Sequence, residues 1–128
     1  MTVNVDPAEI AKFSELAHQW WNPSGDFKPL HEINPLRLDY IDTRVGLRDK
    51  MVLDVGCGAG ALGRDYKWRN PAARYHGIEP DPEAARVAAT RLDAVIAGNV
   101  ESDPAPFGTT RFDCIIFGDV LEHLLDPW

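Results

Sequence analysis

Cysteine is scarce in this chain, and the features that mark exported or membrane-spanning proteins are missing. Cys57 and Cys114 are the two cysteines among 128 residues, and their spacing matches neither a metal site nor a redox pair. No basic segment followed by an apolar run opens the sequence, and no apolar run approaches membrane-spanning length. We therefore expect a cytoplasmic protein with reduced thiols, without a secretory signal or a transmembrane segment.

Positive charge is also in short supply. Lys and Arg number 13 against 20 Asp and Glu, which gives a formal net charge of −7. Such an acidic chain repels a phosphate backbone, so a nucleic-acid substrate is disfavoured and small neutral or cationic molecules fit better. Hydrophobic residues make up 45% of the chain, which is enough for the core of one small domain.

Two helix starts lie in the first 48 residues. Asp6–Pro7 places an N-cap residue before a proline, and Asn34–Pro35 repeats the pattern. Apolar residues follow each start at helical spacing, which predicts two helices joined by a loop that contains Phe27 and His31. We interpret residues 1–48 as a helical segment that acts as a lid or contacts the substrate.

From residue 51 onward, short apolar runs bounded by glycine, proline and polar residues replace the helical pattern. They predict strands at residues 51–55, 74–79, 94–97 and 112–117. They also predict a helix at residues 61–68 and a second one from Pro82 onward that carries Leu92. Strands that alternate with helices indicate an α/β fold with a parallel, doubly wound, Rossmann-like sheet. We interpret residues 49–128 as a cofactor-binding half-domain of this kind.

Three glycines, at positions 56, 58 and 60, follow the first predicted strand. Glycine permits a tight turn there and lets the backbone approach a ligand closely. With Ala61 in the last position, the same run also satisfies a dinucleotide-binding fingerprint. Asp54 lies in the apolar strand just before the loop and is costly to bury without a cationic or donating partner. The ammonium group of S-adenosylmethionine would pair with Asp54, whereas a pyrophosphate would be repelled.

An acidic residue also ends the second predicted strand. Glu79 lies about where an acid accepts hydrogen bonds from ribose hydroxyls, which suits either cofactor. The fourth strand is followed by a polar cluster that contains Asp119, Glu122 and His123, at the sheet edge where ligands bind. The glycine loop, Glu79 and this polar cluster together favour a nucleotide-type cofactor. Asp54 favours S-adenosylmethionine among such cofactors.

The run Leu53-Asp54-Val55-Gly56-Cys57-Gly58-Ala59-Gly60, with Glu79 and the cluster at residues 119–123, resembles class I S-adenosylmethionine-dependent methyltransferases. Upstream, the run from Asn4 to Phe13, Trp20-Trp21, Phe27-Lys28-Pro29-Leu30-His31 and Ile33-Asn34-Pro35-Leu36-Arg37 resemble the ubiquinone-biosynthesis O-methyltransferase family. That resemblance is closest over residues 4–60. Residues 62–81 and 118–128 are more similar to methyltransferase modules found beside glycosyltransferases, which leaves a sugar-related or other small acceptor as an alternative.

The resemblance implies a set of cofactor contacts. Asp54, Gly56, Cys57, Gly58, Gly60, Glu79, Asn99 and Asp119 are the candidate cofactor-binding residues. Asn99 follows the third strand, where the family places a polar group near the adenine. The implied acceptor is a phenolic, polyprenylated quinone precursor, which would bring peripheral contact with a membrane. An alternative hypothesis, from a different functional class, is a nucleotide-binding fragment that does not catalyse a reaction.

Three residues are candidates for catalysis: Asp119, Glu122 and His123. Their spacing places all three on one face of a helix that begins there, with His123 as general base toward a phenol. Two alternatives remain open. The acids could cap a helix, with Glu122 as the partner of Asp119 in a capping box, or all three could bind a divalent cation.

The sheet implied by the resemblance has seven strands in the order 3-2-1-4-5-7-6, and four are predicted here. We therefore expect a fold truncated after the fourth strand, with residues 112–117 as an apolar edge that invites pairing with another chain. Such a chain would bind the cofactor weakly or need the missing half.

Overall fold

The computed structural model describes residues 8, 11, 15, 24, 25, 28–102, 106–118 and 120–127. The described helices are α2 (Lys28–Glu32), α3 (Asn34–Val45), α4 (Ala61–Arg69), α5 (Pro82–Ala89) and the 3-10 turn η1 (Leu121–His123). The strands are β1 (Met51–Val55), β2 (Arg74–Glu79), β3 (Ala94–Ala97) and β4 (Cys114–Phe117). No helix in this described part is long and apolar enough to cross a membrane.

The four strands form one parallel sheet in the order β3-β2-β1-β4, which confirms the predicted α/β class and the predicted order of the first four strands. β1 is central: Leu53 pairs with His76 of β2 on one side and with Ile115 of β4 on the other. All four strands run the same way, so their carboxyl ends meet at one edge of the sheet. That edge carries the glycine loop, Glu79 and the residues that follow β3 and β4.

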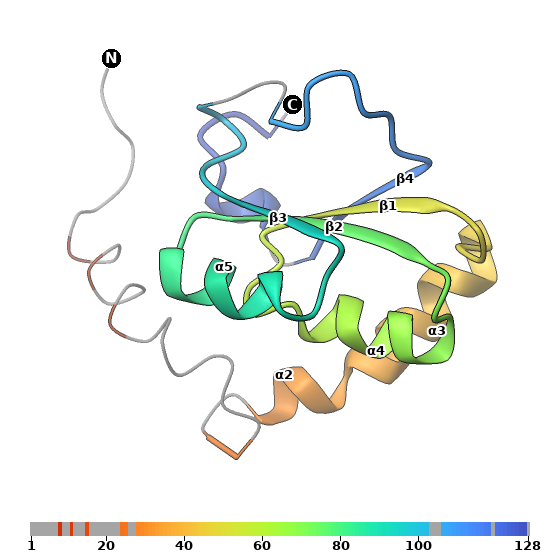
Figure 1. Cartoon of the computed structure of the whole chain (residues 1–128). Coiled ribbons are helices and arrows are strands. Elements are labelled where there is room, and N and C mark those ends of the chain that lie inside the picture. The colour runs from red at the N-terminus through yellow and green to blue at the C-terminus, as the bar shows by residue number, and fades with distance from the viewer. Residues whose placement is uncertain are drawn as a thin grey trace.

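Helices cover one face of this sheet, and irregular chain covers the other (Figure 1). The core on the helical side is built from ten buried residues: Leu38, Leu47, Val52, Cys57, Tyr66, Ala73, Tyr75, Ala88, Leu92 and Ile116. On the opposite side Leu53, Val55 and Ile78 pack under side chains of the segments that follow β3 and β4. Because side chains alternate along a strand, Val52 and Asp54 of β1 both face the helices.

The helical segment before β1 differs from its prediction in two respects. Asn34, which the sequence predicted as an N-cap, is the first residue of α3, and Ile33 is the N-cap. A short helix, α2, occupies residues 28–32, where the sequence predicted a loop around His31. Pro29 is tolerated in the first turn of α2, and Lys28 forms an i,i+4 ion pair with Glu32 at 3.4 Å. Trp20, Trp21 and Phe27 lie outside the described residues, as does most of the predicted first helix, of which Ala8, Ala11 and Glu15 are described as helical.

β4 is shorter than predicted, because it begins at Cys114 rather than at residue 112. The Asp113 carboxylate accepts a hydrogen bond from the Met51 amide at 2.8 Å, and the Asp113 amide donates to the Met51 carbonyl at 2.9 Å. At the start of β1, a side-chain oxygen therefore accepts a hydrogen bond that a strand carbonyl would otherwise accept. Phe112 instead packs against His76, with ring centroids 5.5 Å apart.

Helix α5 begins as predicted and ends earlier than the apolar pattern indicated. Asp81 is its N-cap, and its side chain accepts a hydrogen bond from the Ala84 amide at 3.0 Å. The helix closes at Ala89, since the Thr90 hydroxyl bonds to the Val87 carbonyl at 2.7 Å. Leu92, predicted on the helix, lies beyond it and is still buried in the core.

Candidate cofactor site

The glycine loop joins β1 to α4 in a conformation that requires glycine. Gly56, Gly58 and Gly60 have φ values of 72°, 55° and 79°, in the left-handed region. A Cβ on Gly56 would lie 2.4 Å from Cγ2 of Val120, so the segment after β4 packs directly on the loop. A Cβ on Gly58 would meet nothing within 4 Å, so the backbone there is open to a ligand.

Asp54 is a buried acid beside this loop, with 4% of its surface exposed. Its Oδ2 accepts a hydrogen bond from the Tyr75 hydroxyl at 2.8 Å. Burial raises the pKa of Asp54 from 3.8 to about 7; Tyr75 and Arg37 act to lower it, and the charge of Glu79 raises it further. The carboxylate is therefore poised to gain from a cationic ligand group, because such a group would offset the cost of its burial.

Glu79 ends β2 and reaches across to the glycine loop. Its Oε2 accepts a hydrogen bond from the Gly58 amide at 2.8 Å, and its Oε1 accepts one from the Asp81 amide at 3.1 Å. Burial raises the pKa of Glu79, while these two amides lower it. The two oxygens lie beside the open backbone of Gly58, where they can accept hydrogen bonds from a ligand diol.

Cys57 belongs to the core rather than to the open side of the loop. The residue is 8% exposed, and its Sγ lies 2.5 Å from where a Cβ on Gly77 would be. Burial raises the pKa of the Cys57 thiol, which keeps it neutral. Cys57 and Cys114 are both free thiols. What Cys57 offers a ligand is its backbone, since its side chain fills the gap that Gly77 leaves.

Asn99 lies one turn beyond β3 and close to Glu79. The Gly98 amide donates to the Glu79 carbonyl at 3.0 Å, and Asn99 Oδ1 accepts a hydrogen bond from the Glu101 amide at 2.9 Å. Glu101 in turn accepts from the Leu125 amide at 2.8 Å. The Asn99 side-chain oxygen is thus used in the turn, and that turn holds the segment after β4 in place.

The α-helix predicted to carry Glu122 and His123 does not form. The structure has a three-residue 3-10 turn, η1, with Val120 as its N-cap and no hydrogen bond from the side chain of that residue. The reason lies in Val120, which packs on Gly56 and fixes where the turn begins. Glu122 and His123 are exposed, with 3.8 Å between Glu122 Oε1 and His123 Nε2. Asp119 lies outside the described residues. A capping box of Asp119 with Glu122 stays a prediction, because it involves a residue that is not described.

The described part of the chain contains no set of side chains that could bind a divalent cation. No three His, Cys, Asp or Glu side chains come close enough together there to hold an ion. Because Asp119 is not among those residues, a cation shared by Asp119, Glu122 and His123 stays a prediction.

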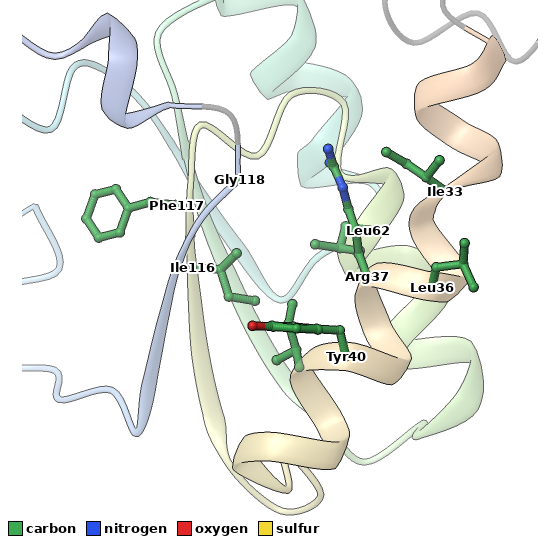
Figure 2. A pocket seen from close by; sticks show the side chains of 9 residues that line it. Ile33, Leu36, Arg37, Tyr40, Leu62, Ile116, Phe117 and Gly118 are labelled. Atoms are coloured by element: carbon green, nitrogen blue, oxygen red, sulfur yellow. The ribbon is translucent and has the colours of Figure 1, made fainter.

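A cavity of about 530 Å³ separates α3 from β4 (Figure 2). Its lining is mostly apolar: Ile33, Leu36, Arg37, Tyr40, Ile41, Leu62, Ile116, Phe117 and Gly118. Figure 2 shows Ile116 pointing toward α3, whereas Phe117 points to the opposite side of β4. The cavity flanks β1, because Ile116 is the register partner of Asp54.

Arg37 is a candidate site residue that was not predicted from the sequence. It extends from α3 at the cavity, and its charge acts to lower the pKa of Asp54, so the two residues face the same region. A signal was present in the sequence: Arg37 precedes Ile41 by four positions and so shares the apolar face of the predicted helix. A cation on such a face requires an anionic partner.

A family model described as "Methyltransferase domain" matches residues 53–128, which is more than half of the chain. The chain belongs to this methyltransferase domain family. The chain is 46% identical to a ubiquinone biosynthesis O-methyltransferase of Azoarcus sp., over 99% of the chain and 56% of that protein. It is 47% identical to the enzyme of the same name from Thiobacillus denitrificans, over 97% of the chain and 55% of that protein. The chain thus spans a little over half the length of these relatives.

Solved structures support the fold of this methyltransferase domain. A crystal structure of magnesium protoporphyrin IX methyltransferase from Synechocystis PCC 6803 with bound S-adenosylmethionine superimposes with a TM-score of 0.67. That comparison covers 97% of this chain and 67% of the other, at 17% sequence identity. At such low identity the match establishes the Rossmann-like architecture alone.

Proposed function

We propose that this methyltransferase domain binds S-adenosylmethionine and forms the cofactor half of an O-methyltransferase acting on a phenolic ubiquinone precursor. The observation that supports S-adenosylmethionine as the cofactor is the buried Asp54 carboxylate beside an open glycine loop. The proposed methyl acceptor is inferred from two relatives that are named for ubiquinone biosynthesis and are 46% and 47% identical to this chain. Nothing in the cofactor site itself selects the acceptor.

The proposed cofactor contacts follow the carboxyl edge of the sheet. The backbone of Gly56, Cys57, Gly58 and Gly60 would cradle the cofactor, and Glu79 would accept hydrogen bonds from its ribose hydroxyls. Asp54 would receive the ammonium group, and Arg37 suits the carboxylate of the same amino-acid moiety. The Asn99 amide group would face the adenine, with Asp119 as a further contact. When bound, the cofactor supplies a methyl group on a positively charged sulfur.

The chain's own part in transfer would be to align the acceptor and remove its proton. A phenol with a pKa near 10 must lose a proton as its oxygen attacks, and His123 is the proposed base that accepts it. Glu122, 3.8 Å from His123, would stabilise the charge that His123 then carries. Asp119 is proposed as a further acid at the same place, in catalysis or as ligand to a divalent cation.

The acceptor is proposed to approach from the side of residues 1–48. Helix α3 of this segment lines the cavity beside β4, and its Leu38 belongs to the main core, so it is fixed relative to the cofactor half. We place the protein in the cytoplasm, with peripheral contact to a membrane where a polyprenylated acceptor resides.

Equilibrium binding tests this proposal most simply. Isothermal titration of the chain with S-adenosylhomocysteine should give measurable binding, and NAD should give none. Glu79→Gln should weaken the binding at least about ten-fold, since one carboxylate that accepts from hydroxyls contributes about 1.5–3 kcal/mol. Glu83→Gln is the matched control, because Glu83 lies on the exposed side of α5 and pairs with Arg86 at 2.6 Å. Binding of NAD in preference would refute the proposal.

A second candidate function is cofactor binding without catalysis. It is favoured by the exposure of Glu122 and His123, which are not enclosed in a water-excluding site. Single-turnover methyl transfer to a catechol separates the two candidates: transfer supports the enzyme, and binding without transfer supports the binding module.

A further inference from the structure

Two neighbouring tyrosines lie buried between the sheet and α4. Tyr66 of α4 and Tyr75 of β2 are 1% and 0% exposed, with ring centroids 6.1 Å apart. They differ in what their hydroxyls do. The Tyr75 hydroxyl donates to Asp54 Oδ2 at 2.8 Å, whereas the Tyr66 hydroxyl is buried without a hydrogen-bond partner in the described part of the chain.

Tyr75 is held firmly in this position. Its amide donates to Asp93 Oδ2 at 2.7 Å, and the Asp93 amide donates to the Tyr75 carbonyl at 3.0 Å. Its ring fills the space that Gly63 leaves open, since a Cβ there would lie 2.5 Å from the ring. Val52, the register partner of Tyr75, precedes Asp54 by two residues, so Tyr75 and Asp54 meet on the same face of the sheet.

Among the described residues, four ionisable groups interact with the Asp54 carboxylate. Tyr75 and Glu79 approach it from β2, Arg37 from α3, and Cys57 from the loop that follows β1. Glu79 opposes a negative charge on Asp54, and Arg37 favours one. Burial keeps both the Cys57 thiol and the Tyr75 hydroxyl neutral by raising the pKa of each. Tyr75 therefore remains a hydrogen-bond donor throughout the physiological pH range.

We propose that Tyr75 is a positioning residue of the cofactor site: its hydroxyl orients the Asp54 carboxylate and stabilises its ionised form, ready to receive the ammonium group of the cofactor. This inference rests on the proposed function. A neutral donor in a dry core stabilises a carboxylate without adding a positive charge that would repel the ligand. Tyr75 thereby offsets part of the cost of burying Asp54, whereas Tyr66, which is equally buried, does not act on it.

Two phenylalanine variants test the role of Tyr75. Tyr75→Phe keeps the ring and removes the donor, and Tyr66→Phe is the matched control, because it removes a buried hydroxyl that has no described partner. The pKa of Asp54 is measured by carbon NMR titration of its carboxyl group in the ligand-free chain. Tyr75→Phe should raise that pKa by about one unit, the equivalent of 1.36 kcal/mol, and Tyr66→Phe should leave it unchanged.

The affinity for S-adenosylmethionine provides the second readout. At pH 7 the expected rise in pKa reduces the ionised fraction of Asp54, and with it the affinity, about five-fold. At pH 8 the loss should shrink to about two-fold or less, because most of the carboxylate is then ionised in both proteins. A loss of affinity independent of pH would indicate a purely structural role and overturn the inference.

The two readouts separate this inference from the proposed function. If the Asp54 pKa is the same in Tyr75→Phe as in the unmodified chain, the role of Tyr75 is refuted while cofactor binding stands. If the unmodified chain does not bind S-adenosylmethionine at any pH, the proposed function fails and the role of Tyr75 fails with it.

Discussion

Replacing Asp54 by asparagine should make the protein more stable at neutral pH while it weakens the cofactor site. Asparagine has almost the same shape, and its side-chain oxygen can still accept the hydrogen bond from Tyr75. What it removes is a negative charge in the core on the helical side of the sheet. Stability and binding should therefore change in opposite directions, as expected where a charge is kept for function.

The size of the effect follows from the pKa of Asp54, which burial raises from 3.8 to about 7. Below pH 3.8 the folded and unfolded states both hold the proton, and the favourable contribution is complete. As the pH rises toward 7 the unfolded state loses its proton first, so the free energy of unfolding falls by about 1.36 kcal/mol per pH unit. Above pH 7 the contribution is lost, which amounts to about 4 kcal/mol in all.

Urea denaturation between pH 5 and pH 8 measures this loss. The unmodified chain should lose about 3 kcal/mol relative to Asp54→Asn over that range, because the other titrating groups are common to both proteins. Asp39→Asn is a control at an exposed carboxylate, which pairs with Arg69 at 2.6 Å and contributes little. Parallel profiles for the unmodified chain and Asp54→Asn would refute the reasoning.

Two further predictions concern packing. Gly63→Ala should lower the free energy of unfolding by about 1 kcal/mol or more, because the added Cβ would lie 2.4–2.5 Å from Leu92 and the fixed Tyr75 ring. Gly98→Ala is the control and should be nearly neutral, because its added Cβ would have no neighbour nearer than 3.8 Å. The midpoints of urea denaturation of the two variants check this prediction. Ile115 is 53% exposed on β4, which forms an edge of the described sheet, so the chain should self-associate through it. Sedimentation velocity should show less association for Ile115→Lys, and equal association would contradict the prediction.

The sheet could be predicted from the sequence because its signals are local. β1, β2 and β3 have the predicted bounds, since each is a short apolar run with breakers on both sides. β4 was predicted two residues too long, because Phe112 and Asp113 continue the apolar run in sequence while Asp113 uses its side chain to bond Met51. Helix α2 was missed because five residues with a proline give no periodic pattern.

Some residues of the candidate site could also be predicted from local sequence signals, and others could not. Asp54 and Glu79 lie near the carboxyl ends of β1 and β2, and the glycines follow β1, so the parallel sheet alone brings them to one edge. Tyr75 could not be recognised from the sequence, because its contact with Asp54 depends on the register of β1 and β2. The helical spacing of Glu122 and His123 was misleading, since the packing of Val120 on Gly56 is a tertiary contact that overrides it.

The central claim is that Asp54 pairs with the ammonium group of S-adenosylmethionine. Isothermal titration of the unmodified chain and Asp54→Asn, with S-adenosylmethionine and with 5′-methylthioadenosine, tests it most directly, because methylthioadenosine has the nucleoside and lacks the amino-acid group. We predict that the substitution lowers the affinity for S-adenosylmethionine at least about ten-fold and changes the affinity for methylthioadenosine by about two-fold or less. An equal loss of affinity for both ligands would contradict it.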